Sequence, residues 1–424
     1  MIMQVSALAN KLKSQLIKDS ALQFILSTSA SLLAFIQIPL LINSLSLSGF
    51  GYIVLAQTVG AIWGTFTIAQ LHQGLLSFAP NNSKSASIIS WSIRASIVNF
   101  IVSTALLALV AGSAIYNIND SILPTSKSDA LTIIPLAIST IIANSPLLGA
   151  IYRIENRYQE FMLYQLVTAT ARLLIIYIAA QSGLGIWFIS MAAFLAPDLI
   201  KIMILHWRSR PQKSLSDLPK SERWKILKFS ITMNITAAAD LPAQQLDKII
   251  LLPFIGIANV GIYQSIKRVG LIISMVTSPF ANSLFHEYSK LVNSGAPQKA
   301  IRLFHLSLAP FFIATTTFSL ALSQTKEIWL PRFLPGAELE VTLLSHVLII
   351  YCIASAFIGL HSLLYALRKL KAALCATLVS NAIFLIGAAI LVPTYQMQGI
   401  IYSLALQVAS ILLIKYYVIR RSLR

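Results

Sequence analysis

Six ionisable side chains stand inside long apolar stretches of this sequence, where a charge needs a specific reason. Arg172 lies in one such stretch, and five more lie in two consecutive stretches further along the chain: Asp240, Asp247, Lys248, Lys267 and Arg268. A charge at the centre of a bilayer costs roughly 2.5–3.5 kcal/mol on insertion scales. Residues that carry this cost commonly line binding sites or ion pathways, so these six are the candidate functional residues.

The spacing predicts where these groups lie along their helices. At ~1.5 Å rise per residue, four of them fall near the middle of their stretches: Arg172, Asp240, Lys267 and Arg268. The remaining two, Asp247 and Lys248, fall near an outer end. At about 100° per residue, one polar arc contains Thr236, Asp240, Gln244, Asp247 and Lys248. Such an arc should face water or a partner group rather than lipid.

This cluster has two interpretations. Three central cations against one acid favour a cationic cavity that binds an anionic ligand, and phosphate suits Lys and Arg donors. Alternatively, the groups pair internally, Asp240 with Lys267 or Arg268 and Asp247 with a neighbour. Asp240 is also a candidate proton-relay or cation-coupling carboxylate. For the group as a whole, the excess of positive charge favours a ligand site.

The other polar residues within the apolar stretches favour structural roles. Asp198 and Lys201 are three residues apart and are expected to form an ion pair. His72 and His361 are expected to be hydrogen-bonded core groups. The chain has no P-loop, HExxH, Cys-x-x-Cys or GxSxG motif. A membrane polymerase or ligase would need a charged outer loop, and the longest here, residues 323–342, is short for such a site, so we expect a non-enzyme without metal or cofactor.

The elements that must position these groups are membrane-spanning helices. Only 11% of the 424 residues are charged and 57% are hydrophobic, too few charges to cover a water-soluble surface. Apolar runs of about 20 residues match the thickness of a bilayer core. We therefore predict an all-α integral membrane protein with about 12 transmembrane helices. The expected spans are residues 21–43, 50–74, 86–116, 130–152, 159–181, 184–206, 225–252, 258–285, 299–322, 342–367, 371–393 and 397–419.

The positive charges predict the orientation. Of 32 Lys and Arg residues, 25 fall in alternate segments between spans, and only Lys127, Lys326 and Arg332 fall in the others. By the positive-inside rule, both termini face the cytoplasm. The net charge of +18 then reflects topology and contact with anionic membrane lipids, and we expect no nucleic-acid partner.

The chain divides into two similar halves. Residues 1–20 are expected to form an interfacial amphipathic helix. A six-helix lobe (21–206), a cytoplasmic linker (207–224), a second six-helix lobe (225–419) and a cytoplasmic tail (420–424) follow. A shift of 210 residues superposes Gly51, Val59 and Gly60 on Gly261, Val269 and Gly270, and Gln37 on Asp247. Two parallel repeats around a central cavity are typical of a transporter with alternating access.

Three segments resemble a known family. They are 247–251 (DKIIL) with 260–268 (VGIYQSIKR), 48–52 (SGFGY) and 153–158 (RIENRY). The first resembles the signature of spans 7 and 8 in the polysaccharide-transport branch of the multidrug/oligosaccharidyl-lipid/polysaccharide exporter superfamily. The others resemble the first connection and a basic inner loop of that branch. Length, span number and the six-plus-six layout agree over essentially the whole chain.

The resemblance implies a flippase of a bacterial inner membrane. Its substrate would be an O-antigen or similar oligosaccharide on undecaprenyl pyrophosphate, moved from the cytoplasmic to the periplasmic leaflet. Arg172, Lys248, Lys267 and Arg268 would bind the pyrophosphate or line its path, and Asp240 and Asp247 would serve ion coupling or gating. A proton or sodium gradient is the implied energy source, and a polysaccharide polymerase and a chain-length regulator are the implied partners.

Two relatives with the same architecture are the alternatives. Multidrug exporters move organic cations, which favour an acid-rich cavity, whereas the charge balance here is positive. Lipid II flippases of the superfamily usually carry two additional spans. The glycan, the coupling ion and the oligomeric state cannot be read from the residues.

Overall fold

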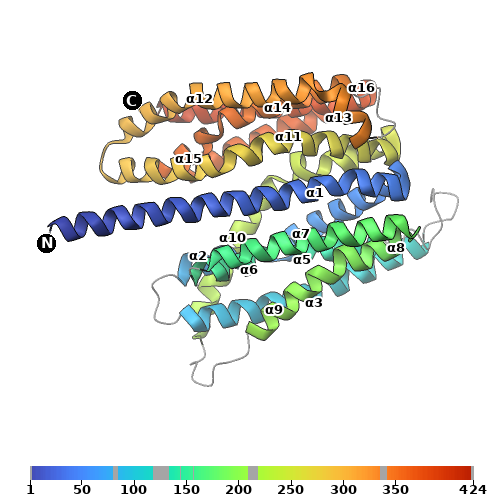
Figure 1. Ribbon diagram of the computed structural model, residues 1–424, viewed down its shortest axis with the longest axis horizontal. Helices are drawn as coiled ribbons and strands as arrows, with labels where there is room; N and C mark the ends of the chain where they lie inside the picture. The colour runs from blue at the N-terminus through green and yellow to red at the C-terminus, as the bar shows by residue number, and fades with distance from the viewer. Residues whose placement is uncertain are drawn as a thin grey trace. The chain divides into compact units, whose positions relative to one another are not determined.

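The apolar stretches fold as helices because a helix satisfies its backbone hydrogen bonds within one segment, as a bilayer requires. The computed structural model describes residues 2–79, 85–117, 133–143, 145–155, 157–208, 218–334 and 341–421. This part of the chain consists of helices joined by turns and short loops, and it contains no β-strand (Figure 1). The predicted all-α class is confirmed.

The number of membrane crossings also agrees with the prediction. In the described residues, nine helical stretches are long and apolar enough to cross a membrane. Three of these contain one residue with a non-helical backbone, namely Ser46 in α1 (Ile2–Thr67), Gly256 in α11 (Asp247–Asn293) and Gln396 in α16 (Leu370–Arg421). Because each of these residues divides its stretch in two, the described part of the chain contains about 12 spans.

The first compact unit consists of residues Met1–Leu40 and Trp63–Asn234. Its hydrophobic core consists of Leu147, Ile151, Phe161 and buried residues from the helices before and after them. It holds most of α10 (Lys220–Ala239) and both ends of α1, together with the elements α2 (Leu71–Phe78), α3 (Ser85–Asn117), α5 (Ile133–Ala143), α6 (Leu147–Ile154), α7 (Tyr158–Gln181), α8 (Ile186–Ile189), the π-helix η1 (Ser190–Leu195) and α9 (Ala196–Arg208).

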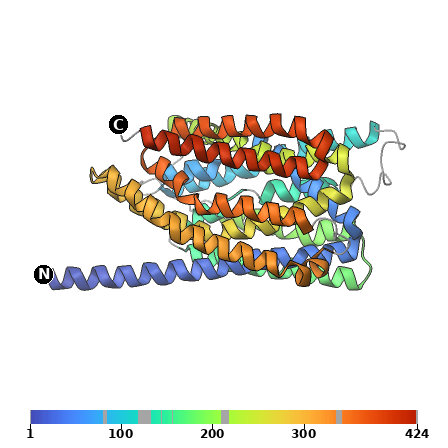
Figure 2. The same cartoon turned by 90° about the horizontal axis from the view of Figure 1, so that it is seen from above.

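The second unit consists of residues Leu41–Ile62 and Ile235–Arg424. Within it α11, α12 and α14 lie side by side in two perpendicular views (Figures 1 and 2). Its elements are the end of α10 (Lys220–Ala239), the π-helix η2 (Pro242–Leu246), α11, α12 (Pro297–Gln324), α13 (Lys326–Phe333), α14 (Val341–Ala356), α15 (Ile358–Ala366) and α16. The short helix α13 occupies the predicted outer loop, of which residues 335–340 lie outside the described part.

Two helical hairpins organise the second unit. Gly256 has φ 75° and ψ 171°, a conformation that is strained for a residue with a Cβ atom, and here the chain reverses between residues 242–255 and 257–293. We call this the Gly256 hairpin. Gln396 marks the second reversal, because Gly387 approaches Ser403 and Gly399 approaches Leu391 across α16. Residues equally far from each reversal therefore lie opposite one another.

Gly51 and Gly261, which suggested the internal repeat, contact each other within the second unit. A Cβ atom on Gly261 would lie 3.3 Å from the Cα of Gly51, and one on Gly51 would lie 2.1 Å from the carbonyl oxygen of Ile257. The two helices therefore approach as closely as their backbones allow, which only glycine permits.

The boundaries of the two packed units differ from those of the two predicted halves of the chain. Leu41–Ile62 packs with the second unit, while residues 225–234 pack with the first. The predicted lobes, 21–206 and 225–419, stay a prediction. The side chains of the predicted interfacial helix (1–20) lie outside the described part, as do residues 209–217 of the linker and 422–424 of the tail.

Candidate functional site

Asp247 is the centre of a polar cluster in the second unit. Its side chain is fully buried. Oδ2 accepts hydrogen bonds from Tyr263 Oη at 2.7 Å and from the Lys267 ammonium. Oδ1 accepts the backbone N–H of Lys248 at 3.0 Å and lies 3.4 Å from Lys248 Nζ. Donors from both arms of the Gly256 hairpin thus surround the carboxylate, as a buried charge requires.

The π-helix η2 provides backbone acceptors for the two lysines. Its first residue is a proline, which has no N–H, and the change from α to π geometry leaves carbonyl groups without their usual donors. Lys267 Nζ donates to the carbonyl of Ala243 at 2.7 Å. Lys248 Nζ donates to the carbonyl of Gln244 at 2.7 Å and to Gln245 Oε1 at 2.9 Å. The ammonium groups are therefore fixed in position rather than free to move.

A cavity of about 480 Å³ opens beside this cluster, within the size range of small-molecule sites. We call it the lysine cavity. Its polar lining residues are Gln244, Gln245, Lys248, Gln264, Lys267, Tyr351 and Gln407. Its apolar lining residues are Ala243, Leu271, Ile350, Ala354, Leu404 and Val408.

The charge around the lysine cavity is not balanced. Lys248 and Lys267 contribute two positive charges, and Asp247 behind them contributes one negative charge. Lys267 Nζ makes two of the three hydrogen bonds that an ammonium can donate. A residual positive charge with an available donor suits an anionic ligand group.

Asp247 and Lys267 lie at a similar depth, which differs from the prediction. The sequence placed Asp247 near the outer end of its span and Lys267 near the middle of the next. Because the reversal falls at the single residue Gly256, nearly equal lengths of helix separate it from Asp247 and from Lys267. The two side chains therefore meet directly.

Arg268 points to a different partner. Its Nη2 donates to Oε1 of Gln57 at 3.0 Å, so it links α11 to the Leu41–Ile62 segment of α1 in the second unit. Arg268 is not among the residues that line the lysine cavity. Its predicted role as a ligand-binding cation stays a prediction.

Asp240 lies apart from Asp247. It occupies the turn between α10 and η2, which interrupts the helix, so the predicted polar arc over residues 236–248 is not continuous. Its electrostatic partner is Lys415, whose Nζ lies 3.0 Å from Nδ1 of His361. Pairing of Asp240 with Lys267 is therefore wrong, because Lys267 binds Asp247. The hydrogen-bonded role expected for His361 is confirmed.

Arg172 belongs to the first unit. Its Nε donates to the carbonyl of Ala193 in the π-helix η1 at 2.9 Å, and its guanidinium lies 5.1 Å from the ring centroid of Phe194. Its Nη2 is 3.9 Å from Oδ2 of Asp198, which also accepts a hydrogen bond from Ser139 at 2.6 Å. In both units, therefore, a cation binds a π-helix carbonyl close to a buried aspartate.

Lys201 binds backbone groups where the sequence predicted a pair with Asp198. Its Nζ donates to the carbonyls of Ile142, Ala143 and Ser145 at 3.0, 3.3 and 2.7 Å. These carbonyls lie at the break between α5 and α6, where intrahelical donors are missing. Lys201 thus caps a broken helix.

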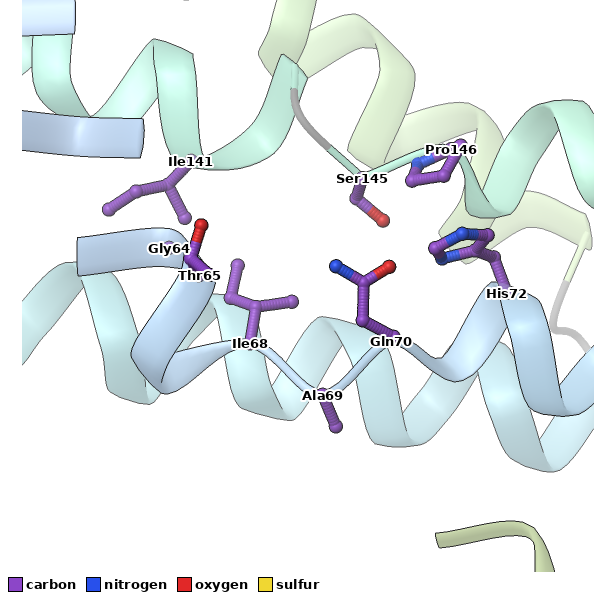
Figure 3. A pocket seen from close by; sticks show the side chains of 9 residues that line it. All are labelled: Gly64, Thr65, Ile68, Ala69, Gln70, His72, Ile141, Ser145 and Pro146. Atoms are coloured by element: carbon purple, nitrogen blue, oxygen red, sulfur yellow. The ribbon is translucent and has the colours of Figure 1, made fainter. Parts of the chain in front are cut away.

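A second cavity of about 40 Å³ lies at the same break (Figure 3). Gln70 and His72, from the α1–α2 connection and α2, point toward Ser145 across it. The volume has room for water rather than for a larger ligand. The expected core position of His72 is confirmed.

Five polar lining residues of the lysine cavity were not among the predicted site residues: Gln244, Gln245, Gln264, Tyr351 and Gln407. A polar group inside an apolar span was the available signal, but it does not reveal which spans pack together. Among the described residues, no cluster of three or more His, Cys, Asp or Glu side chains offers a metal site.

Solved structures with similar folds are membrane transporters. The lipid II flippase MurJ in an inward closed conformation has a TM-score of 0.70 at 13% identity, covering 94% of this chain and 87% of that one. An inward-facing multidrug resistance MATE transporter of the MOP superfamily has a TM-score of 0.63 at 13% identity, covering 94% of both chains. A MOP superfamily transporter from Pyrococcus furiosus, described as having a binding pocket of reverse polarity, has a TM-score of 0.62 at 12% identity, covering 95% and 94%.

The family assignment rests on the sequence match. No curated protein matches the chain. Residues 16–291, well over half of the chain, match the family model for polysaccharide biosynthesis proteins. The segments that suggested the polysaccharide-transport branch, 48–52, 153–158 and 247–268, all fall within this match. The chain is therefore a multi-pass membrane protein that belongs to the polysaccharide biosynthesis protein family.

Proposed function

We propose that this protein flips undecaprenyl-pyrophosphate-linked oligosaccharide repeat units from the cytoplasmic to the periplasmic leaflet by alternating access. The observation that carries the proposal is the lysine cavity, where Lys248 and Lys267 outnumber the single acid, Asp247. The family match to polysaccharide biosynthesis and the transporter fold support it. O-antigen or a related surface polysaccharide is the proposed product.

In this proposal the pyrophosphate occupies the lysine cavity. The uncommitted N–H of Lys267 donates to a phosphate oxygen, and Lys248 contributes charge from the adjacent wall. Arg268 in the second unit and Arg172 in the first are the further proposed contacts of the headgroup during transport. The ligand restores the charge balance that the buried residues leave incomplete.

The two acids have separate roles. Asp247, saturated by donors, acts in gating because it holds the two arms of the Gly256 hairpin together. Asp240, at the helix break and near Lys415, is the candidate for coupling to a proton or sodium gradient. Both termini then face the cytoplasm of a bacterial inner membrane, and a polymerase and a chain-length regulator are the downstream partners.

Export of cationic drugs is the competing function. A cavity with a net positive charge repels an organic cation, so the balance of Lys248, Lys267 and Asp247 disfavours that substrate. A flippase accepts a pyrophosphate anion in the same place.

The test is complementation of a strain that lacks its own O-antigen flippase. Wild type should restore long surface polysaccharide. Arg172→Ala, Lys248→Ala, Lys267→Ala and Arg268→Ala should instead accumulate lipid-linked units inside the cell. Lys225→Ala and Lys299→Ala, at exposed positions of α10 and α12, are the matched controls and should behave as wild type.

The outcome separates the two functions. Membrane levels are matched by immunoblot, and the lipid-linked units are quantified from extracted lipid. Normal transport by all four of these cation variants, or efflux of ethidium by the wild type without any polysaccharide, would contradict the flippase proposal.

A further inference from the structure

Two neutral polar side chains flank Lys267 at the lysine cavity. Gln264 precedes Lys267 by three residues in α11, so the two are neighbours on one helix face. Tyr351 reaches the same cavity from α14. Neither side chain has a part in the proposed binding of pyrophosphate. The hydrogen-bonding groups that they present determine how the cavity can hold a ligand.

Gln264 presents an N–H donor to the cavity. Its Oε1 atom is buried and has no hydrogen-bond partner in the described part of the protein. The side chain nevertheless lines the cavity, so the accessible end of the amide is Nε2. A buried oxygen without a donor is costly, and a charged acceptor that binds Nε2 from the cavity offsets this cost.

Tyr351 presents a hydroxyl group. Its ring packs against α11 at Gly270, three residues after Lys267, where a Cβ atom would lie 2.9 Å from Cε2 of the tyrosine. The ring therefore rests directly on the helix backbone. The hydroxyl makes no hydrogen bond to the described part of the protein, and the side chain lines the cavity. A phenol in this position can donate its proton to a ligand.

The two donors lie on opposite sides of Lys267 along α11. From Gln264 to Gly270, on which the ring of Tyr351 packs, the helix rises ~9 Å. Lys267 lies midway and retains one N–H for a ligand. A single phosphate at Lys267 should reach one of the flanking donors at a time, whereas two linked phosphates should extend along the row and reach both.

We propose that Gln264 and Tyr351 are specificity residues through which the lysine cavity selects a pyrophosphate over a single phosphate. The Gln264 amide donates to one phosphate group, the Tyr351 hydroxyl donates to the other, and the Lys267 ammonium lies between them. This inference rests on the proposed function. Because both specificity residues are neutral, they distinguish the ligands by the positions of acceptor oxygens rather than by charge.

The test compares two lipids for each purified variant in nanodiscs of phosphatidylcholine, which has no net charge. The lipids are undecaprenyl pyrophosphate and undecaprenyl phosphate. Microscale thermophoresis gives both dissociation constants, and their ratio measures the selectivity. Wild type should bind the pyrophosphate at least about tenfold more tightly. Part of this preference comes from the larger charge of the pyrophosphate, so the variants must leave the charge of the cavity unchanged.

Tyr351→Phe and Gln264→Leu meet this requirement, because each removes a neutral donor and keeps nearly the same volume. Each should weaken binding of the pyrophosphate about tenfold, as expected for the loss of one hydrogen bond to a charged group. Each should weaken binding of the single phosphate less than about twofold, because that ligand can use the remaining donor. Tyr395→Phe and Gln398→Leu, at exposed positions of α16, are the matched controls and should bind both lipids as wild type does.

The outcomes separate this inference from the proposed function. Thermal unfolding without added lipid should be the same for the variants and wild type, which shows that they are folded. If wild type binds both lipids equally, or the variants keep the wild-type ratio or weaken both lipids to the same extent, the selectivity is overturned while the anion site at the lysines stands. If wild type binds neither lipid, the proposed function fails as well.

Discussion

Lys267 and Asp247, twenty residues apart in the chain, form an ion pair across the Gly256 hairpin. The contact joins the last part of one span to the first part of the next. It also connects the lysine cavity to a fully buried carboxylate. A single reversal of the chain thus determines both the stability of the hairpin and the position of the cation that we assign to the ligand.

Replacing Gly256 with alanine should destabilise the second unit. The backbone angles of Gly256, φ 75° and ψ 171°, are strained for any residue with a Cβ atom, at a cost on the order of 1–3 kcal/mol. The free energy of unfolding in SDS measures this loss. Gly112→Ala in α3 is the control, because its surroundings are open and its helix should gain up to about 1 kcal/mol. Equal stability of the two variants would refute the role given to the Gly256 hairpin.

Asp247→Asn should destabilise the protein by about 3–5 kcal/mol, because it leaves two buried ammonium groups without their counter-charge. Adding Lys248→Met restores the net charge of the cluster, so the double variant should be more stable than Asp247→Asn alone. Thermal unfolding in detergent compares the three proteins. Additive losses would show that Lys248 and Asp247 act independently.

The contact between Arg268 and Gln57 should contribute about 1.5–3 kcal/mol, as expected for a hydrogen bond to a charged group. A double-mutant cycle with Gln57→Leu and Arg268→Met isolates the coupling energy in SDS unfolding. A coupling energy near zero would mean that Arg268 does not fix the Leu41–Ile62 segment.

Lys201→Met should destabilise the first unit by at least about 2 kcal/mol, because three carbonyls at the α5–α6 break lose their shared donor. Hydrogen exchange should rise around residues 142–145 and stay constant in the second unit. Lys228→Met, at an exposed position of α10, serves as the control. Unchanged exchange in the Lys201 variant would show that the cap is dispensable.

Much of the candidate site was accessible from residue type alone. Asp247, Lys248 and Lys267 were identified because charges are rare in apolar spans, and the structure brings these three together. The glutamines are less conspicuous, because an amide costs less in an apolar span than a charge does. Gln407 became a candidate only when α16 was seen to line the cavity that Lys267 lines.

The sequence by itself determined the fold class, the number of spans and the residues that carry charge into the membrane. These properties follow from hydrophobicity and length, which act locally along the chain. Only the tertiary structure decided which of these charged side chains contact one another. The turn at Asp240 and the reversal at Gly256 separate Asp240 from Asp247 and place Asp247 beside Lys267. Helical periodicity assumes an unbroken helix, so it cannot predict contacts across the points where the helix breaks.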